Sequence, residues 1–292
     1  MGKSGLMRAF RRILLLCCLA LAVPAWAVPA LWQVSNGKGT LTLYGTIHAL
    51  PPGQDWFSRK ARAAFNRADT LVVEMVAPDD PAEMAGIVQA LGMMPAPVPI
   101  RDRLAADVRP QYDSLVRSSD FPLAGLDRMK SWFAALSLVQ LEMLAGGIDP
   151  SAGVDVTLIG RARAAKKRLV GLETPRGQLE LFNGLPEAEQ RLLLASAVTD
   201  AGQSRSAMRA LIAAWSAGDV ERIRKEFDDS SLSPELEIRL FRDRNAAWAA
   251  HVSTALKANG RHFMAVGAAH MAGPDSLITM LEARGFRVRR VE

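Results

Sequence analysis

Two segments near opposite ends of the chain share one construction, and this repetition constrains the fold more than any other feature. Residues 41–48 and 263–270 each hold four strand-forming residues, a glycine, two further residues and a histidine. In open α/β sheets, ligands gather beyond the carboxyl ends of the strands. A glycine at such an end permits a sharp turn, a positive φ angle or the close approach of another group. If the two strands lie side by side, His48 and His270 project into one crevice.

The remaining patterns predict an α/β fold. The run at residues 71–75 is continuously apolar and rich in β-branched residues, which is typical of a buried strand. A helix at 58–68 separates it from the strand at 41–44, and this order suggests that the two strands form a parallel pair. We expect a central mixed, mostly parallel sheet built from two related half-sheets and flanked by helices, with a large helical insertion between them. Further strands are predicted at residues 169–171, 263–266 and 286–291, and helices at 80–145 (three), 186–259 and 274–284.

The first 27 residues have the pattern of a cleaved export signal. Four basic residues precede a short apolar run, and Ala25-Trp26-Ala27 matches the small-x-small pattern before a cleavage site. The apolar run is too short to span a bilayer comfortably. An uncleaved membrane anchor is the alternative. We expect a periplasmic or secreted protein with no stable anchor after cleavage, and a single domain over residues 28–292.

Cleavage would change what the composition implies. The chain has 36 basic and 30 acidic residues, and the signal removes four basic and no acidic ones, which leaves a net charge of about +2. Basicity therefore gives no support to nucleic-acid binding. Cys17 and Cys18 are the two cysteines, and both leave with the signal. Any metal in the mature protein must then be held by His, Asp or Glu.

Glu74 is the third residue that points to a metal site. It lies inside the apolar run 71–75, where an unpaired carboxylate would be costly. A bound cation or a fixed arginine removes that cost. With His48 and His270 it makes a set of two histidines and one carboxylate, which leaves coordination positions open for water and substrate. The alternative is a purely structural bridge between Glu74 and Arg244.

Other candidates carry less weight. His251 lies within a predicted helix and is assigned to packing or the surface, and His262 precedes a strand and is expected at its exposed start. The chain contains no His-Glu-x-x-His, Gly-x-Ser-x-Gly or P-loop motif.

Six short motifs occur in order along the chain. They are Gly45-Thr46-Ile47-His48-Ala49-Leu50-Pro51, Val73-Glu74, Gly153-Val154-Asp155, Gly171-Leu172-Glu173-Thr174, Arg244-Asn245 and Val266-Gly267-Ala268-Ala269-His270. This ordered set resembles the TraB/GumN family, which includes the Tiki metalloproteases. The likeness covers about residues 31–291, and it extends more distantly to the ChaN and erythromycin-esterase proteins. It implies a central sheet flanked by helices and a metal-supported site from His48, Glu74 and His270. Met271 stands where the family usually has leucine.

The resemblance and the residues together suggest an exported metal-dependent hydrolase that cleaves a peptide or other amide bond of a peptide or small-molecule substrate in the cell envelope. The divalent metal (Zn, Mn, Co or Fe) would polarise the carbonyl and acidify a bound water. Glu173 would act as general base, and Arg244 would stabilise the oxyanion or position a carboxylate. The alternative, from the ChaN-like resemblance, is a periplasmic protein that binds haem or a metal ion without turnover.

Overall fold

The computed structural model describes residues 27–37, 39–118, 123–201, 204–228, 233–257 and 260–292. Of the predicted signal peptide, only Ala27 lies within these residues, so the export prediction is not addressed by the structure. No helix in the described part of the chain is long and apolar enough to cross a membrane.

The centre of the molecule is one six-stranded sheet in the order β4-β3-β5-β2-β1-β6. The four strands β4, β3, β5 and β2 run parallel, while β1 is antiparallel to both β2 and β6. This confirms the predicted α/β fold with a mixed, mostly parallel sheet. The strands are β1 (Leu31–Ser35), β2 (Thr40–Thr46), β3 (Thr70–Met75), β4 (Arg168–Glu173), β5 (His262–Gly267) and β6 (Arg287–Arg290).

One predicted pairing is wrong. The strands β2 and β3 are parallel, as their strand–helix–strand order suggested, but they are not neighbours, because β5 lies between them. Every residue of β5 from Phe263 to Val266 is fully buried. A strand that is apolar on both faces is stabilised most at the middle of a sheet covered by helices, which explains why β5 takes that place.

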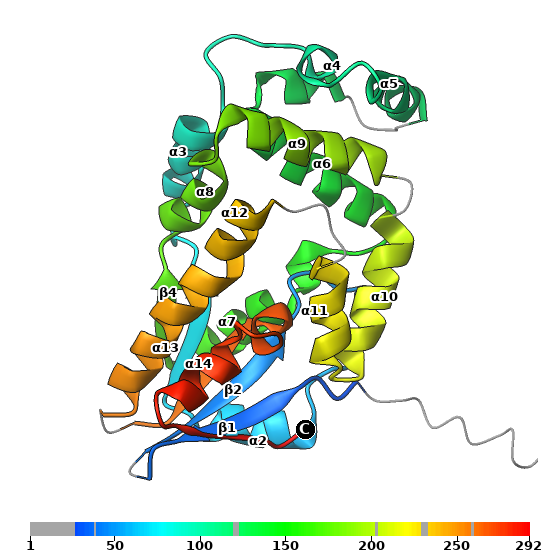
Figure 1. The fold of residues 1–292 in the computed structure, drawn as a ribbon. Coiled ribbons are helices and arrows are strands. Elements are labelled where there is room, and N and C mark those ends of the chain that lie inside the picture. Colours follow the sequence, from blue (N-terminus) through cyan, green and yellow to red (C-terminus); the bar gives the residue numbers. More distant parts are fainter. Residues whose placement is uncertain (1–26, 38, 119–122, 202–203, 229–232, 258–259) are drawn as a thin grey trace, which may run out of the picture.

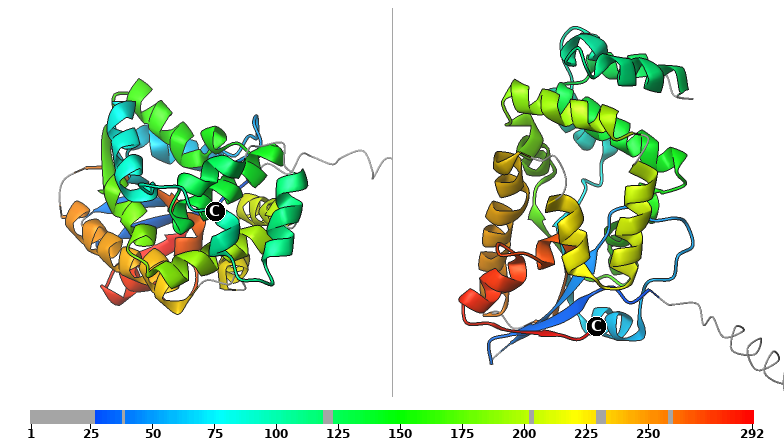
Figure 2. Two further views of the ribbon diagram at one scale, coloured as in Figure 1. Left: turned by 90° about the horizontal axis from the view of Figure 1, so that it is seen from above. Right: turned by 45° about the vertical axis from the view of Figure 1, so that its right-hand side comes forward.

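Helices surround the sheet and extend beyond the carboxyl ends of its parallel strands (Figures 1 and 2). Capping signals in the sequence set several of their ends: the side chain of Asp80 accepts a hydrogen bond from the Ala82 amide at the start of α3. The α-helices are α2 (Arg59–Arg67), α3 (Pro81–Gly92), α4 (Ile100–Arg103), α5 (Arg109–Ser118), α6 (Ser131–Ala145), α7 (Val154–Ala164), α8 (Pro175–Asn183), α9 (Glu187–Thr199), α10 (Ser204–Ser216), α11 (Val220–Asp228), α12 (Pro234–Glu237), α13 (Asp243–Ala255) and α14 (Leu277–Ala283).

The predicted helix at residues 274–284 starts later than expected. Its N-cap is Ser276, whose hydroxyl accepts from the Thr279 amide, so α14 begins at Leu277. Gly273 has a φ of +86° and turns the chain before the cap. Serine is among the strongest N-cap residues, and this local hydrogen bond decides the boundary.

The apolar core has two parts. The larger part covers both faces of the sheet, and the smaller one lies where α6 packs on α9, together with side chains from α4 and α5. The smaller core belongs to the helical half beyond the strand ends (Figure 1). The last residues of the parallel strands therefore lie at the junction between the sheet and this helical half.

Candidate active site

The register of the two central strands brings both Gly-x-x-His motifs to the same edge of the sheet. Gly45 pairs with Val266, and Thr46 pairs with Gly267. Each histidine follows three residues after its glycine, so His48 and His270 leave neighbouring strands at the same level. The two motifs are 222 residues apart in the numbering of their histidines, 48 and 270, yet they form one site.

Glu74, near the end of β3, occupies the centre of this site. Its side chain is 10% exposed, and its Oε1 accepts a hydrogen bond of 2.7 Å from the Gly267 amide. The same oxygen lies 3.9 Å from Nε2 of His48. Burial raises the pKa of Glu74, but the charges of His48 and Arg244 and the Gly267 hydrogen bond outweigh it and lower the pKa to about 2. Glu74 is therefore a buried carboxylate that stays ionised.

Gly267 leaves open the space that these groups share. A Cβ at this position would lie 3.2 Å from Oε1 of Glu74, 3.5 Å from Cδ2 of His270 and 3.8 Å from Nε2 of His48. The φ angle of Gly267 is −50°, and Gly45 is not among the glycines with positive φ. Of the reasons predicted for glycine here, close approach is the one that the structure supports. The absence of a side chain at Gly267 lets these three functional side chains approach its backbone closely.

His48 is held from the other side by the start of α7. Its Nδ1 lies 3.3 Å from Oδ1 of Asp155, and its side chain is 62% exposed. Desolvation by the surrounding protein lowers the pKa of His48, but the Asp155 contact and the charge of Glu74 outweigh it and raise the pKa to about 9. A Cβ on Gly153 would lie 2.3 Å from the His48 carbonyl oxygen, and the Val154 amide donates to the Ile47 carbonyl at 3.0 Å. The Gly153-Val154-Asp155 segment therefore packs closely against the first Gly-x-x-His motif.

His270 is buried, with 5% of its surface exposed. Its Nδ1 lies 2.7 Å from Oδ1 of Asn245, and its Nε2 lies 3.3 Å from Nη1 of Arg244. Its ring packs against Trp248 and Phe241, at centroid distances of 4.4 and 5.1 Å. Burial, the largest effect, and the neighbouring Arg244 lower the pKa of His270 to about 3. The imidazole is therefore neutral near pH 7.

Arg244 connects the two glutamates. Its Nη2 donates to Oε2 of Glu74 at 2.6 Å, and its Nε donates to Oε1 of Glu173, at the end of β4, at 2.7 Å. A second bond to Glu173, from Nη2 to Oε2 at 3.0 Å, makes that pair bidentate. Trp248 donates to Oε1 of Glu173 as well, at 3.0 Å. The bridge between Glu74 and Arg244 that the sequence left open is present, as part of a larger network.

One helix face supplies four of these groups. Phe241, Arg244, Asn245 and Trp248 are spaced at i, i+3, i+4 and i+7, which places them on one side of a helix. Phe241 belongs to a π-helical turn (Ile238–Arg242) that joins α12 to α13. Such turns frequently occur at functional sites. This face covers His270 and carries the arginine into the centre of the site.

The structure brings together all five residues singled out from the sequence, namely His48, Glu74, Glu173, Arg244 and His270. It leaves His251 within α13 and His262 at the opposite end of β5 from Gly267. Among the described residues, no three or more His, Cys, Asp or Glu side chains are arranged closely enough to count as a metal-binding group. Sequence reasoning gave no role to Asp155, Asn245, Trp248 or Phe241, although the helical spacing of the last three around Arg244 was a usable signal.

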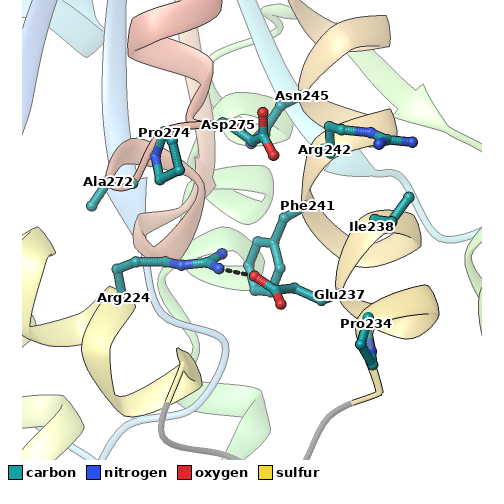
Figure 3. Close-up of a pocket in the computed structure, with 11 residues that line it drawn as sticks. Arg224, Pro234, Glu237, Ile238, Phe241, Arg242, Asn245, Ala272, Pro274 and Asp275 are labelled. Atoms are coloured by element: carbon teal, nitrogen blue, oxygen red, sulfur yellow. Dashed lines mark hydrogen bonds and ion pairs between the residues drawn. The ribbon is translucent and has the colours of Figure 1, made fainter.

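A cavity of about 240 Å³ adjoins the site behind His270. Figure 3 shows the ion pair between Arg224 of α11 and Glu237 of α12 across it, with Phe241 beside the pair and with Asn245 and Asp275 at one end. Asn245 and Phe241 are the residues that both line the cavity and contact His270. The cavity therefore touches the support of the site and not its centre.

The comparison with known proteins finds a family to which the chain is similar. The model of the TraB/PrgY/gumN family matches residues 30–290, which is nearly all of the described chain. No curated protein and no solved structure matches significantly.

Proposed function

This chain belongs to the TraB/PrgY/gumN family, and from that membership and the geometry of the site we propose that it is a metal-dependent hydrolase. The proposed reaction is cleavage of a peptide or other amide bond by a metal-activated water. The observation that carries the proposal is the convergence of His48, Glu74 and His270 around the space left by Gly267. Glu74 of β3 meets there with one histidine from each of the segments that follow β2 and β5, at the carboxyl ends of the parallel strands.

The residues fit a divalent ion in their donor chemistry. Two imidazoles and one ionised carboxylate suit borderline metals such as Zn, Mn, Co or Fe, and the space beside Gly267 is one that a Cβ would fill. His48, Glu74 and His270 would hold the ion. Arg244 donates to Oε2 of Glu74 and faces Nε2 of His270, so the guanidinium and a metal compete for these two atoms.

A bound metal would polarise the substrate carbonyl and acidify a water molecule. Around it, the exposed side of His48 gives solvent and substrate an approach to the site. The guanidinium of Arg244 carries donors that can stabilise a developing oxyanion or a substrate carboxylate. Glu173 and Trp248 hold this arginine in place. Glu173 is proposed as the general base. Both of its carboxylate oxygens already accept hydrogen bonds from Arg244 or Trp248, so the role requires that one of these bonds gives way to a water molecule.

The predicted signal peptide supports an exported enzyme, acting on a peptide or small molecule in the periplasm or outside the cell. The near-neutral charge of the mature chain favours such a substrate over nucleic acid. We also propose that the mature protein has no membrane anchor once the signal peptide is cleaved.

Metal content tests the proposal directly. The mature protein, produced without a histidine tag, is measured for bound divalent metals by elemental analysis beside a His48→Ala, His270→Ala double variant. A His251→Ala, His262→Ala double variant is the matched control, because it removes two histidines outside the site. We expect metal in the wild type and the control, and none in the site variant. Equal metal in all three proteins would refute the proposed site.

Turnover is tested separately from binding. The metal-loaded protein is incubated with unfolded protein and peptide substrates, and cleavage is followed by mass spectrometry, with the site variant as the blank. Hydrolysis that depends on His48 supports the enzyme. Metal or haem binding without hydrolysis supports the alternative of a binding protein, and haem titration monitored near its Soret band distinguishes those two ligands.

A further inference from the structure

Asn245 is a buried amide whose orientation is fixed by its neighbours. It is 1% exposed, and its Nδ2 donates a hydrogen bond of 2.8 Å to the backbone carbonyl of Asp275. Because a carbonyl can only accept, this bond determines which end of the amide is nitrogen. The oxygen Oδ1 is then directed at Nδ1 of His270, 2.7 Å away. Figure 3 shows Asn245 and Asp275 beside each other at the edge of the cavity.

This arrangement determines the tautomer of His270. An amide oxygen cannot donate, so Nδ1 of His270 must carry the proton, and Nε2 must present its lone pair. The contact of the other ring nitrogen, Nε2, independently indicates the same tautomer. Nε2 lies 3.3 Å from Nη1 of Arg244, and a guanidinium has only donors. The Asn245 contact, at 2.7 Å, is the shorter of the two.

We propose that Asn245 is a positioning residue that fixes the protonated nitrogen of His270 and so leaves the Nε2 lone pair facing Arg244, the residue that also binds Glu74. Asn245 makes no contact with Glu74 itself and acts through the histidine. Partners on the far nitrogen of a metal-binding histidine orient the ring and raise its affinity for metal. The part of the inference that concerns affinity rests on the proposed function. The part that concerns the tautomer does not.

The tautomer is measured in metal-free protein. The chain has four histidines, and selective ¹⁵N labelling of them permits long-range ¹H–¹⁵N correlation, which distinguishes a protonated ring nitrogen from a bare one. The His251→Ala and His262→Ala variants assign the signals. We expect His270 with its proton on Nδ1 in the wild type and in Asn245→Asp, which keeps the acceptor. In Asn245→Ala the ring keeps only the longer 3.3 Å contact between Nε2 and Arg244, so we expect part of the population to carry the proton on Nε2. A proton on Nε2 in the wild type, or an unchanged tautomer in Asn245→Ala, overturns the inference.

Affinity is measured with cobalt(II) alone. We expect Asn245→Ala to bind it about 10- to 100-fold more weakly than the wild type, and Asn245→Asp to restore most of the loss. Circular dichroism of each variant establishes that it is folded, and a variant that is unfolded is replaced by Asn245→Ser. If wild type binds no cobalt but shows the expected tautomer, the proposed function fails and the positioning role stands. If cobalt binds equally well to wild type and Asn245→Ala, the positioning role fails and the proposed function stands.

Discussion

At the scale of single residues, the site depends on space as much as on charge. Gly267 and Gly153 both lie where a methyl group would meet a functional residue: the first would approach Oε1 of Glu74, and the second the His48 carbonyl. Neither glycine has a positive φ angle, so backbone conformation does not explain why glycine is present. The second Gly-x-x-His motif, and the segment that packs on the first, therefore need glycine because other groups approach the backbone closely.

Gly267→Ala should disrupt the site. The added Cβ would lie 3.2 Å from Oε1 of Glu74, in a buried and tightly packed place, so we expect a loss of about 1–3 kcal/mol in the free energy of unfolding together with weaker metal binding. Urea unfolding and metal titration measure the two effects. Gly86→Ala, in the middle of α3 with nothing within 4 Å of its Cβ position, is the control and should gain about 0.5–1 kcal/mol. Unchanged stability and metal affinity in Gly267→Ala would contradict this account.

Asp155→Asn should lower the pKa of His48. The Asp155 contact is the largest of the effects that raise this pKa to about 9, and an amide supplies no negative charge. Titration of the ring protons by NMR in metal-free protein should show a value nearer 6.5 in the variant. Because the folded pKa is the raised one, the protonated histidine stabilises the fold fully below about pH 6.5 and ceases to do so as the pH rises through 9. A His48 that titrates identically in both proteins would show that Asp155 does not act on it.

At the scale of helices and strands, the sequence predicted well what local patterns determine. The apolar runs identified β2, β3 and β5, and Asp80 marked the start of α3. It could not determine that β5 inserts between β2 and β3, because that choice depends on packing between segments that are distant along the chain. The short strand β1 was not predicted, and it forms only because β2 and β6 pair with it.

The residues of the candidate site likewise fall into those that local sequence patterns predict and those that only tertiary contacts reveal. Residues inside a recognisable motif, such as His48 and Glu74, were predicted from spacing and from the cost of burying a charge. Asn245 and Asp155 were part of quoted motifs but had no predicted role, since nothing local reveals which ring nitrogen they would contact. Their function depends on tertiary structure, which brings α13 to His270 and α7 to His48.

The packing of α10 on β2 gives an element-scale prediction. Nε1 of Trp215 donates to the Gly45 carbonyl at 3.0 Å, inside the first motif, so Trp215→Phe leaves a buried acceptor without this donor. We expect a loss of about 1–3 kcal/mol from the hydrogen bond beyond that from lost ring volume. Trp132→Phe is the matched control, because Trp132 is fully buried and its Nε1 has no hydrogen-bond partner among the residues that the structure describes. Chemical denaturation should show the larger loss for Trp215→Phe, and equal losses would argue against a stabilising role for this bond.

At the scale of the whole molecule, metal binding should be linked to unfolding. A ligand that binds only the folded state stabilises it by about 2.7 kcal/mol when its free concentration is 100 times its dissociation constant. We expect added divalent metal to raise the melting temperature of the wild type and of His262→Ala, but not of His48→Ala. His48 is exposed, so its removal should leave the fold intact. An equal thermal shift in His48→Ala would mean that the metal binds elsewhere.

The place of β5 has a consequence for biogenesis. This strand starts at His262 and lies between two strands that were made about 200 residues earlier. Until it arrives, β2 and β3 have no partner at the middle of the sheet, and two exposed strand edges of this kind readily pair with other chains. A chain that is interrupted before this strand therefore lacks the middle of the sheet and also lacks His270. The candidate site is completed only in the final stretch of synthesis.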